Sequence, residues 1–177
     1  MFLDHNPDDI DVRIAELLVA TTDAADPLVH PKVQEALHIL RESMKMDAVF
    51  VSEFKDNERI FKVVDCGRSG TLAPGQSDPL EETWCQRVVD GRLPQLVKDA
   101  NGYVKSGAVP PQGIAIGTIL STPVVLKNGN VYGTLCCFSH QVKDEASLTD
   151  LRRLQITAKL LAEDLLHSQD PAADSQS

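Results

Sequence analysis

Residues Gly117–Ser139 read GTILSTPVVLKNGNVYGTLCCFS, which is a pair of apolar, β-branched runs on either side of Asn128-Gly129. An Asn-Gly pair accepts positive φ at both positions, so it favours the two-residue type I′ turn of a β-hairpin. After the turn, successive side chains alternate between the faces of a strand. One face carries Val131, Gly133, Leu135 and Cys137, and the other carries Tyr132, Thr134, Cys136 and Phe138. Because neither face is polar, we expect an antiparallel sheet that helices cover on one face and that closes a pocket with the other.

The segments before this hairpin have patterns of their own. Apolar residues at helical spacing predict a short helix over Asp11–Ala20 and a longer one that begins at Pro31, with a linker over Thr21–Pro31. Residues 47–54 and 59–66 predict a second hairpin, which turns over the polar residues 55–58.

The middle of the chain predicts a helix between two loops. Residues Gly67–Gln76 contain three glycines and a proline and predict a loop. Asp78-Pro79-Leu80-Glu81 has the pattern of a helix start, with Asp as the N-cap, and this helix should end near Gly91. Leu93–Val97 predicts a short edge strand. Lys98–Gly117 is long for a connection, which is typical of a lid, a binding segment or a segment with a short helix.

The last helix and the chain ends complete the predicted organisation. Ser147 and Asp150 form a capping pattern, and the helix that follows should continue to about Leu166. We expect an N-terminal helix and linker over residues 1–30, one domain over residues 31–167, and a disordered polar tail over residues 168–177.

Composition narrows the classes of function. The formal net charge is −9, which argues against binding to nucleic acid. No apolar run approaches the roughly 20 residues that a membrane helix needs, and the N-terminal residues lack the pattern of a signal peptide. The four cysteines have no paired spacing, so we expect thiols in a reducing cytoplasm.

Several of these stretches resemble a GAF domain, the sensory module of bacterial signalling proteins and phosphodiesterases. The resemblance covers about Lys32 to Leu166 and is carried by Pro79–Gly91, Lys98-Asp99, and Thr122–Val124 joined to Val131–Cys136. The chain is similar in particular to GAF domains attached to diguanylate cyclases and phosphodiesterases. The resemblance implies an α+β fold, in which the first and last helices cover one face of a central antiparallel sheet. The other face, the helix at Pro79 and the loop from Lys98 would enclose a small molecule.

The candidate ligand-binding residues lie on the strands, the helix and the loop that would enclose this pocket. They are Phe50, Ser52, Val63, Asp65, Trp84, Cys85, Asp99, Ser121, Tyr132, Thr134 and Cys136. Asp99 could orient an amine or hydroxyl of the ligand, or it could be a solvated or capping carboxylate. The hydroxyls of Ser121, Tyr132 and Thr134 could bind a ligand or simply pack in the sheet.

Three known ligand classes of GAF domains do not match the residues. Bilin-binding members attach the chromophore through a cysteine followed by histidine, and this chain has no Cys-His pair. The Asn-Lys…Phe…Asp-Glu signature of cyclic-nucleotide members is absent. Free methionine-sulfoxide reductases of this fold use cysteines in the loop that corresponds to Asp99–Thr118, which has none here. The ligand and any cofactor are left unidentified.

The cysteines and the catalytic motifs decide between the remaining functions. Cys85 lies near the start of a helix, where a thiol pKa can fall, but a buried and inert cysteine is the commoner case. Cys136 and Cys137 should point to opposite faces and cannot share a metal ion. No phosphate-binding loop, nucleophile elbow or His-Glu-x-x-His motif is found, which argues against an enzyme.

We therefore expect a non-enzymatic sensory domain that binds a small molecule and signals through its terminal helices or a protein partner. The alternatives are a thiol enzyme or redox sensor built on Cys85 or Cys66, and a domain that only dimerises. Apolar residues at three- and four-residue steps in the last helix predict a homodimer seam, which consists of Leu151, Leu154, Ala158, Leu161 and Leu165. A stripe buried within one chain would have the same spacing.

Overall fold

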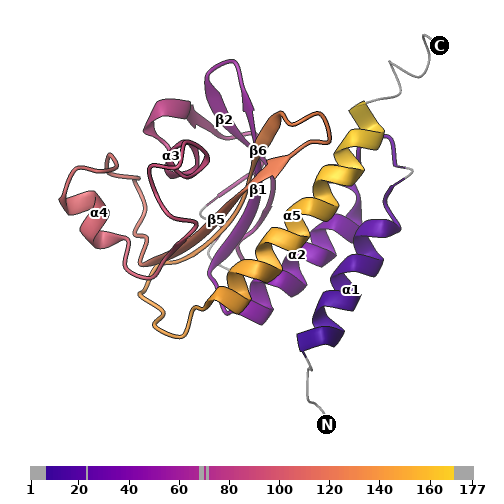
Figure 1. Ribbon diagram of the computed structural model, residues 1–177, viewed down its shortest axis with the longest axis horizontal. Helices are drawn as coiled ribbons and strands as arrows, with labels where there is room; N and C mark the ends of the chain where they lie inside the picture. Colours follow the sequence, from indigo (N-terminus) through magenta and orange to yellow (C-terminus); the bar gives the residue numbers. More distant parts are fainter. Residues whose placement is uncertain (1–6, 23, 68–69, 71, 170–177) are drawn as a thin grey trace.

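The computed structural model describes residues 7–22, 24–67, 70 and 72–169. Within them, one antiparallel sheet has the strand order β3-β2-β1-β6-β5-β4 (Figure 1). The strands are β1 (Ala48–Lys55), β2 (Glu58–Asp65), β3 (Ser77–Pro79), β4 (Leu96–Val97), β5 (Thr118–Val125) and β6 (Val131–Ser139). The fold is α+β, as expected from the sequence.

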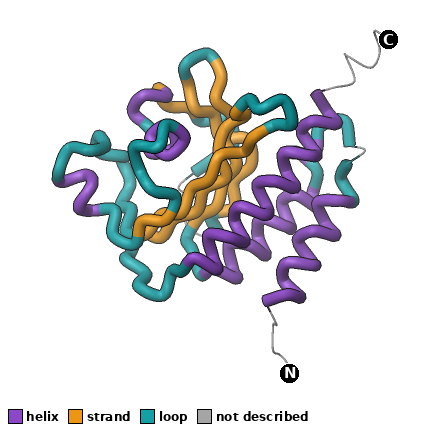
Figure 2. The backbone as a smooth tube through the Cα atoms, viewed as in Figure 1, coloured by secondary structure: helices purple, strands orange, loops and turns teal. Residues whose placement is uncertain are grey.

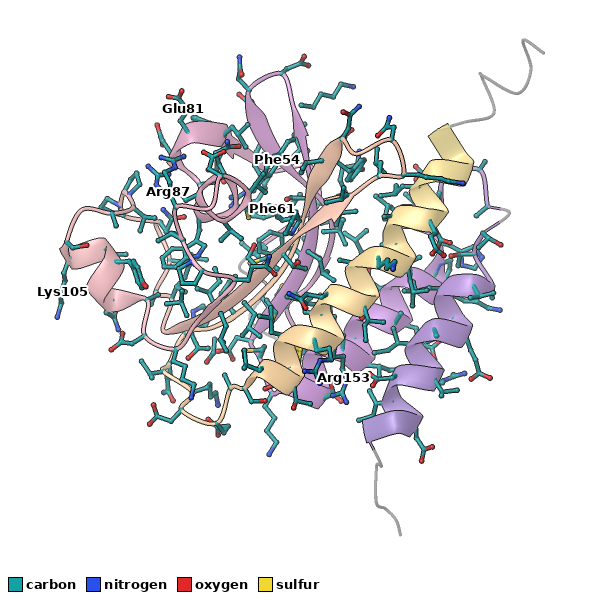
Figure 3. The ribbon with its side chains drawn as sticks, viewed as in Figure 1. Phe54, Phe61, Glu81, Arg87, Lys105 and Arg153 are labelled. Atoms are coloured by element: carbon teal, nitrogen blue, oxygen red, sulfur yellow. The ribbon has the colours of Figure 1, made fainter. Side chains whose placement is uncertain are left out.

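Three helices cover one face of the sheet. Helix α2 (Pro31–Met44) lies against β1 and β2, α5 (Leu148–Gln169) lies against β5 and β6, and α1 (Pro7–Val19) packs on both helices. The Arg153 guanidinium of α5 donates a hydrogen bond to the Asp11 carboxylate of α1 over 2.6 Å, where the two helices meet (Figure 3). The apolar side chains of α1 thus belong to the same core as α2, α5 and the sheet.

Short elements and loops cover the other face, as Figure 2 shows. They are the 3₁₀ turn η2 (Leu80–Glu82), α3 (Trp84–Val89) and α4 (Asn101–Lys105). A further 3₁₀ turn, η1 (Pro27–Val29), lies in the predicted linker and buries Leu28 against the helices. Strand β6 separates two cores: Leu135 and Cys137 face the helices, while Cys136 and Phe138 face α3. The prediction that Cys136 and Cys137 point to opposite faces is confirmed.

Both predicted hairpins form, but their turns differ from the expectation. Only Gly129 has a positive φ in the β5–β6 turn, at 90°, and the Leu126 amide donates to the Asn130 carbonyl over 2.8 Å. This is a three-residue loop over Lys127–Gly129, so the prediction of a type I′ turn here is wrong. Asp56 and Asn57 between β1 and β2 both have positive φ, at 54° and 64°, which is the type I′ pattern.

The predicted helix start at Asp78-Pro79 is also wrong. Ser77–Pro79 is β3, an edge strand that pairs with β2, and Pro79 is tolerated there because an edge strand leaves half of its N–H groups unpaired. Helix α3 begins later, with Thr83 as its N-cap, whose hydroxyl accepts a hydrogen bond from the Gln86 amide over 3.2 Å. The predicted end near Gly91 and the predicted cap of α5 by Ser147 and Asp150 are confirmed.

The predicted dimer seam lies mostly inside this chain. Leu154, Ala158, Leu161 and Leu165 belong to the core between α5, α1 and the sheet, and only Leu151 is partly exposed. The predicted tail lies almost entirely outside the described residues. No helix within the described ranges is long and apolar enough to cross a membrane.

Candidate functional site

A cavity of about 420 Å³ lies between the sheet and the segments that cover its second face. Four aromatic side chains form much of its wall: Phe50, Phe61, Trp84 and Phe138. The rings of Phe50 and Phe61 meet edge to face, with centroids 4.7 Å apart. Ile114, Ile116, Ile119 and Leu72 add aliphatic surface, and Gln76, Ser77 and Gln112 add polar groups. This is the mixture of apolar wall and few polar groups that small-molecule sites have.

The loop between α4 and β5 is tied to α3 and closes one side of the cavity. The Arg87 guanidinium donates hydrogen bonds to the Ala108 carbonyl over 3.0 Å and to the Glu81 carbonyl over 2.6 Å. The Gln112 amide donates to the Glu82 carbonyl over 3.2 Å. Figure 3 shows Arg87 and Glu81 near the short helix on this side of the sheet. The long connection predicted from sequence is therefore an ordered wall that carries Ile114 and Ile116 into the site.

Arg59 is the cation of the cavity. Strands β2 and β3 pair Arg59 with Asp78, and the guanidinium donates a hydrogen bond to that carboxylate. The guanidinium carbon of Arg59, Cζ, lies 4.5 Å from the ring centre of Phe61, within the range of a cation–π contact. Only 9 % of Arg59 is exposed, and its Nε–H has no partner among the described residues. Burial lowers the pKa of Arg59, but the neighbouring Cys85 and Asp78 outweigh burial, and the net pKa is raised.

Two thiols lie beside Arg59. Arg59 Nη1 donates to Cys85 Sγ over 3.9 Å, and Cys136 lines the same cavity beside Cys85. The interaction with the Cys136 side chain and the charge of Arg59 lower the pKa of Cys85, against the effect of burial. Burial raises the pKa of Cys136, and the interaction with the Cys85 side chain adds to the rise. Cys85 is buried, as expected for a cysteine on a packed helix face, and whether it is inert stays a prediction.

Four of the predicted site residues line the cavity, namely Phe50, Trp84, Cys85 and Cys136. Thr134 and Ser52 do not line the cavity, and their hydroxyls lie 2.8 Å apart in a buried hydrogen bond. Ser121 pairs with Cys136 across β5 and β6, and its buried hydroxyl has no partner in the described part of the chain.

Three predicted site residues face the helices instead. Cross-strand pairing changes by one residue between Val51 and Ser52, so that Phe61 faces the cavity while Val63 faces the helices. Asp65 follows Val63 on that face, and it accepts a hydrogen bond from Arg41 over 2.8 Å. A second irregularity at Val124/Val125 leaves Tyr132 as an extra residue in β6, and its ring joins the helix-side core. The bulges reverse the alternation on which these expectations depended.

Asp99 lies outside the cavity. Its Oδ1 accepts hydrogen bonds from the backbone and side-chain N–H groups of Asn101, both over 3.0 Å, at the start of α4. Asp99 is exposed and the N-cap of α4 is Ala100, so this carboxylate is solvated and holds Asn101 in the turn before the helix, which is close to the solvated or capping alternative.

Arg59, Asp78 and the isoleucines of the loop were missed by the sequence reasoning. Arg59 is two residues from Phe61 in a strand, so the strand period itself could have placed both on one face. Asp78 was predicted to be a helix N-cap, so its position in the edge strand β3 was not predicted. Ile114 and Ile116 alternate in a Gly- and Pro-rich loop, a signal of an apolar wall. Within the described ranges, no group of three or more His, Cys, Asp or Glu side chains could hold a metal ion.

Solved structures of the same fold include proteins with different chemistry. The GAF domain of an Acinetobacter phosphoenolpyruvate-protein phosphotransferase has a TM-score of 0.70 at 16% identity, over 94% of this chain and 96% of that chain. Free methionine-R-sulfoxide reductase from Neisseria meningitidis, in complex with its substrate, has a TM-score of 0.69 at 16% identity and 97% of both chains. The phycoerythrobilin-bound GAF domain of a cyanobacterial phytochrome has a TM-score of 0.68 at 13% identity, over 94% of this chain and 98% of that chain.

The sequence comparisons agree with the fold. A comparison with curated protein sequences gives no match. The family model described as GAF domain matches residues 33–163, which span α2 to α5 and every strand described above. Since that match covers well over half of the residues and the six-stranded sheet is shared with solved GAF domains, the chain belongs to the GAF domain family.

Proposed function

We propose that this chain is a non-enzymatic sensory domain that binds a small molecule in the cavity between the sheet and α3. The observation that carries the proposal is a pair of buried donors beside an aromatic wall. The Nε–H of Arg59 and the Nε1–H of Trp84 have no hydrogen-bond partner among the described residues. Buried N–H groups are nearly always paired in folded proteins, so a ligand with acceptor atoms would complete them.

The lining indicates the class of ligand. Four aromatic rings and three isoleucines favour a flat, mostly apolar molecule, and the cavity of about 420 Å³ suits a compact one. The two unpaired donors favour a carbonyl or carboxylate on it. A strongly cationic ligand is disfavoured, because Arg59 is buried in the wall.

The helices on the other face provide a route for the signal. Strand β6 contributes Cys136 and Phe138 to the cavity side and Leu135 and Cys137 to the helix side. A ligand that shifts β6 would therefore change the packing of α5, which we propose carries the output to a protein partner. We place the domain in the cytoplasm as part of the proposal, because four cysteines without paired spacing are typical of a reducing compartment.

A homodimer remains part of the proposal, with a different contact from the predicted seam. Because most of that seam is buried inside the chain, a second copy would have to use the outer surface of α5 around Ile156, which is 48 % exposed.

A thermal-shift series with native mass spectrometry tests the proposal. The probes are benzoate, indole-3-acetate and their amides, compared with toluene, which has the ring and no acceptor. Ligands that bind only the folded state raise the melting temperature, so the acids or amides should raise it and toluene should raise it less. A molecule that co-purifies with the chain should be released on unfolding and should carry an acceptor group.

Two variants assign the effect to the cavity. Ile114→Trp places bulk in the cavity from its loop wall, and should abolish the shift while the protein stays folded. Val125→Trp puts the same side chain at an exposed position outside the cavity and is the matched control. A full shift in Ile114→Trp, or no shift with any probe and no co-purified molecule, would contradict the proposal.

A further inference from the structure

Two thiols from distant parts of the chain lie in the wall of the cavity. Cys85 belongs to α3 and Cys136 to β6, and both line the same space. Their side chains are close enough that each changes the pKa of the other. The fold thus places two buried sulfurs in the wall of one cavity, with Cys85 1 % and Cys136 0 % exposed, so a reagent has to enter the cavity to reach them.

Cys85 is surrounded by donors that stabilise a thiolate. It accepts a hydrogen bond from the Arg59 guanidinium over 3.9 Å, and the side chains of Cys136 and Thr134 also favour its thiolate. The Thr134 hydroxyl is in turn within 2.8 Å of the Ser52 hydroxyl, which fixes its position. The carboxylate of Asp78 holds the other end of the guanidinium. A thiolate held by such donors is the nucleophilic form of cysteine.

We propose that Cys85 and Cys136 are a peroxide-reactive dithiol, in which Cys85 is the nucleophile and Cys136 is the resolving thiol. The oxidant is a hydroperoxide, ROOH, that enters the cavity. The inference does not depend on which ligand the cavity binds.

The reaction balances in two steps. The Cys85 thiolate attacks the terminal peroxide oxygen, the O–O bond breaks, and the leaving alkoxide takes a proton from water, which gives Cys85–SOH, ROH and hydroxide. The Cys136 thiolate, formed when that hydroxide removes the thiol proton, then attacks the Cys85 sulfur. The S–S bond forms and the S–O bond breaks, and the departing hydroxide takes up the proton that Cys85 released to solvent when it became a thiolate, which gives water. The two sulfurs lose two electrons in total, and the peroxide is reduced by two.

The other two cysteines have surroundings of a different kind. Cys137 faces the helices, and burial raises its pKa, so it stays a thiol. Cys66 lies outside the cavity lining, and its thiol donates to the Leu72 carbonyl over 3.7 Å. The structure therefore assigns reactivity to one pair of the four cysteines.

Intact-mass spectrometry of the full chain after reduction, desalting and brief exposure to equimolar hydrogen peroxide tests the assignment. The expected product is the loss of about 2 Da, which corresponds to one disulfide. Non-reducing tryptic mapping should join the peptide that ends at Arg87 to the peptide Asn128–Lys143. Because that second peptide contains both Cys136 and Cys137, the same map in Cys137→Ser identifies the partner.

The variants separate the two roles. Cys136→Ser should leave a sulfenic acid on Cys85 that dimedone traps, and Cys85→Ser should lose both products. Cys137→Ser is the matched control and should form the disulfide as the unmodified chain does. Arg59→Met should slow Cys85 oxidation by about tenfold or more, and Arg59→Lys should restore part of the rate.

Several outcomes would overturn the proposal. They are four intact thiols in the unmodified chain after prolonged exposure to peroxide, a disulfide that is lost in Cys137→Ser, and first oxidation at Cys66. The decisive measurement uses the unmodified chain, so it can contradict the proposal even if a variant fails to fold.

Discussion

Gly133 is the residue at which the sheet tolerates no side chain. It lies in β6 between Glu53 of β1 and Val124 of β5. A Cβ atom built there would stand 1.9 Å from the Ser52 carbonyl oxygen and 2.7 Å from the Ser52 carbonyl carbon. Both atoms are backbone of the neighbouring strand, so the clash can be relieved only by moving β1 or β6. Ser52 also holds Thr134 beside Cys85, so this contact reaches the site.

Gly133→Ala should therefore destabilise the fold by about 1–3 kcal/mol, the usual cost of overpacking a well-packed region. Gly102→Ala is the matched control, because Gly102 lies in α4, has no positive φ and has no heavy atom within 4 Å of the added Cβ. It should leave stability unchanged or raise it slightly. Urea denaturation of both variants measures the difference, and equal stabilities would show that β1 and β6 are not so close.

At the level of elements, the two hairpins reverse the chain direction with different turns. The β1–β2 turn has positive φ at Asp56 and Asn57, whereas the β5–β6 loop needs it at Gly129 alone. No heavy atom lies within 4 Å of a Cβ built at Gly129. The requirement for glycine in this loop is therefore one of backbone conformation and not of space.

Gly129→Val should cost about 1–3 kcal/mol, because a β-branched residue is strained at positive φ. Gly129→Asn should cost less, since asparagine tolerates left-handed backbone better. Thermal melts of the two variants and the unmodified chain give the comparison. Equal melting temperatures for Val and Gly at this position would show that the loop does not hold the positive φ.

The elements also show what could be predicted from sequence. Both hairpins, α2, and the cap of α5 depend on local patterns, and all were predicted. The wrong predictions concern patterns that are ambiguous or that depend on contacts distant in sequence. Asp78-Pro79 fits both a helix start and an edge strand, and it forms a strand because it pairs with β2. Two bulges then moved Val63 and Tyr132 to the helix face, and a period of two cannot show where an extra residue falls. The contact of Cys85 with Cys136 needs the whole fold.

For the whole molecule, the burial of Tyr132 and Cys137 on the helix side of the sheet limits the stability of the fold at alkaline pH. Burial raises the pKa of Tyr132, and the nearby carboxylates of Glu53 and Asp26 raise it further. Burial also raises the pKa of Cys137, with a contribution from Asp150. Above the unfolded pKa the unfolded chain loses its proton while the folded chain keeps it. Stability is therefore complete below that pH and falls above it.

Tyr132→Phe should make the protein relatively more stable as pH rises past about 10, the ordinary pKa of tyrosine. Each unit above that pH should widen the difference by about 1.4 kcal/mol, because one proton is involved. At pH 7 the two proteins should differ little from one another in this respect, which provides the internal control. Guanidinium unfolding at pH 7, 10 and 11 measures it, and parallel pH profiles would contradict the burial of the phenol.

The arrangement of α5 between the sheet and α1 determines which surface is open to a second copy of the chain. Leu161 has no exposed surface and packs in the core with α1, whereas 48 % of Ile156 is exposed on the same helix. A charge at Leu161 would therefore act on the folded chain itself and not on a contact between chains.

Leu161→Glu should destabilise the fold by about 3 kcal/mol or more, since it buries an unpaired carboxylate and removes core packing. Ile156→Glu should change the free energy of unfolding by no more than about 0.5 kcal/mol. Light scattering at micromolar concentration then answers the question of assembly. If the unmodified chain is a dimer through the outer surface of α5, Ile156→Glu should halve its mass without unfolding it. A dimer that survives Ile156→Glu would exclude this surface, and a stable, folded Leu161→Glu monomer would restore the predicted seam.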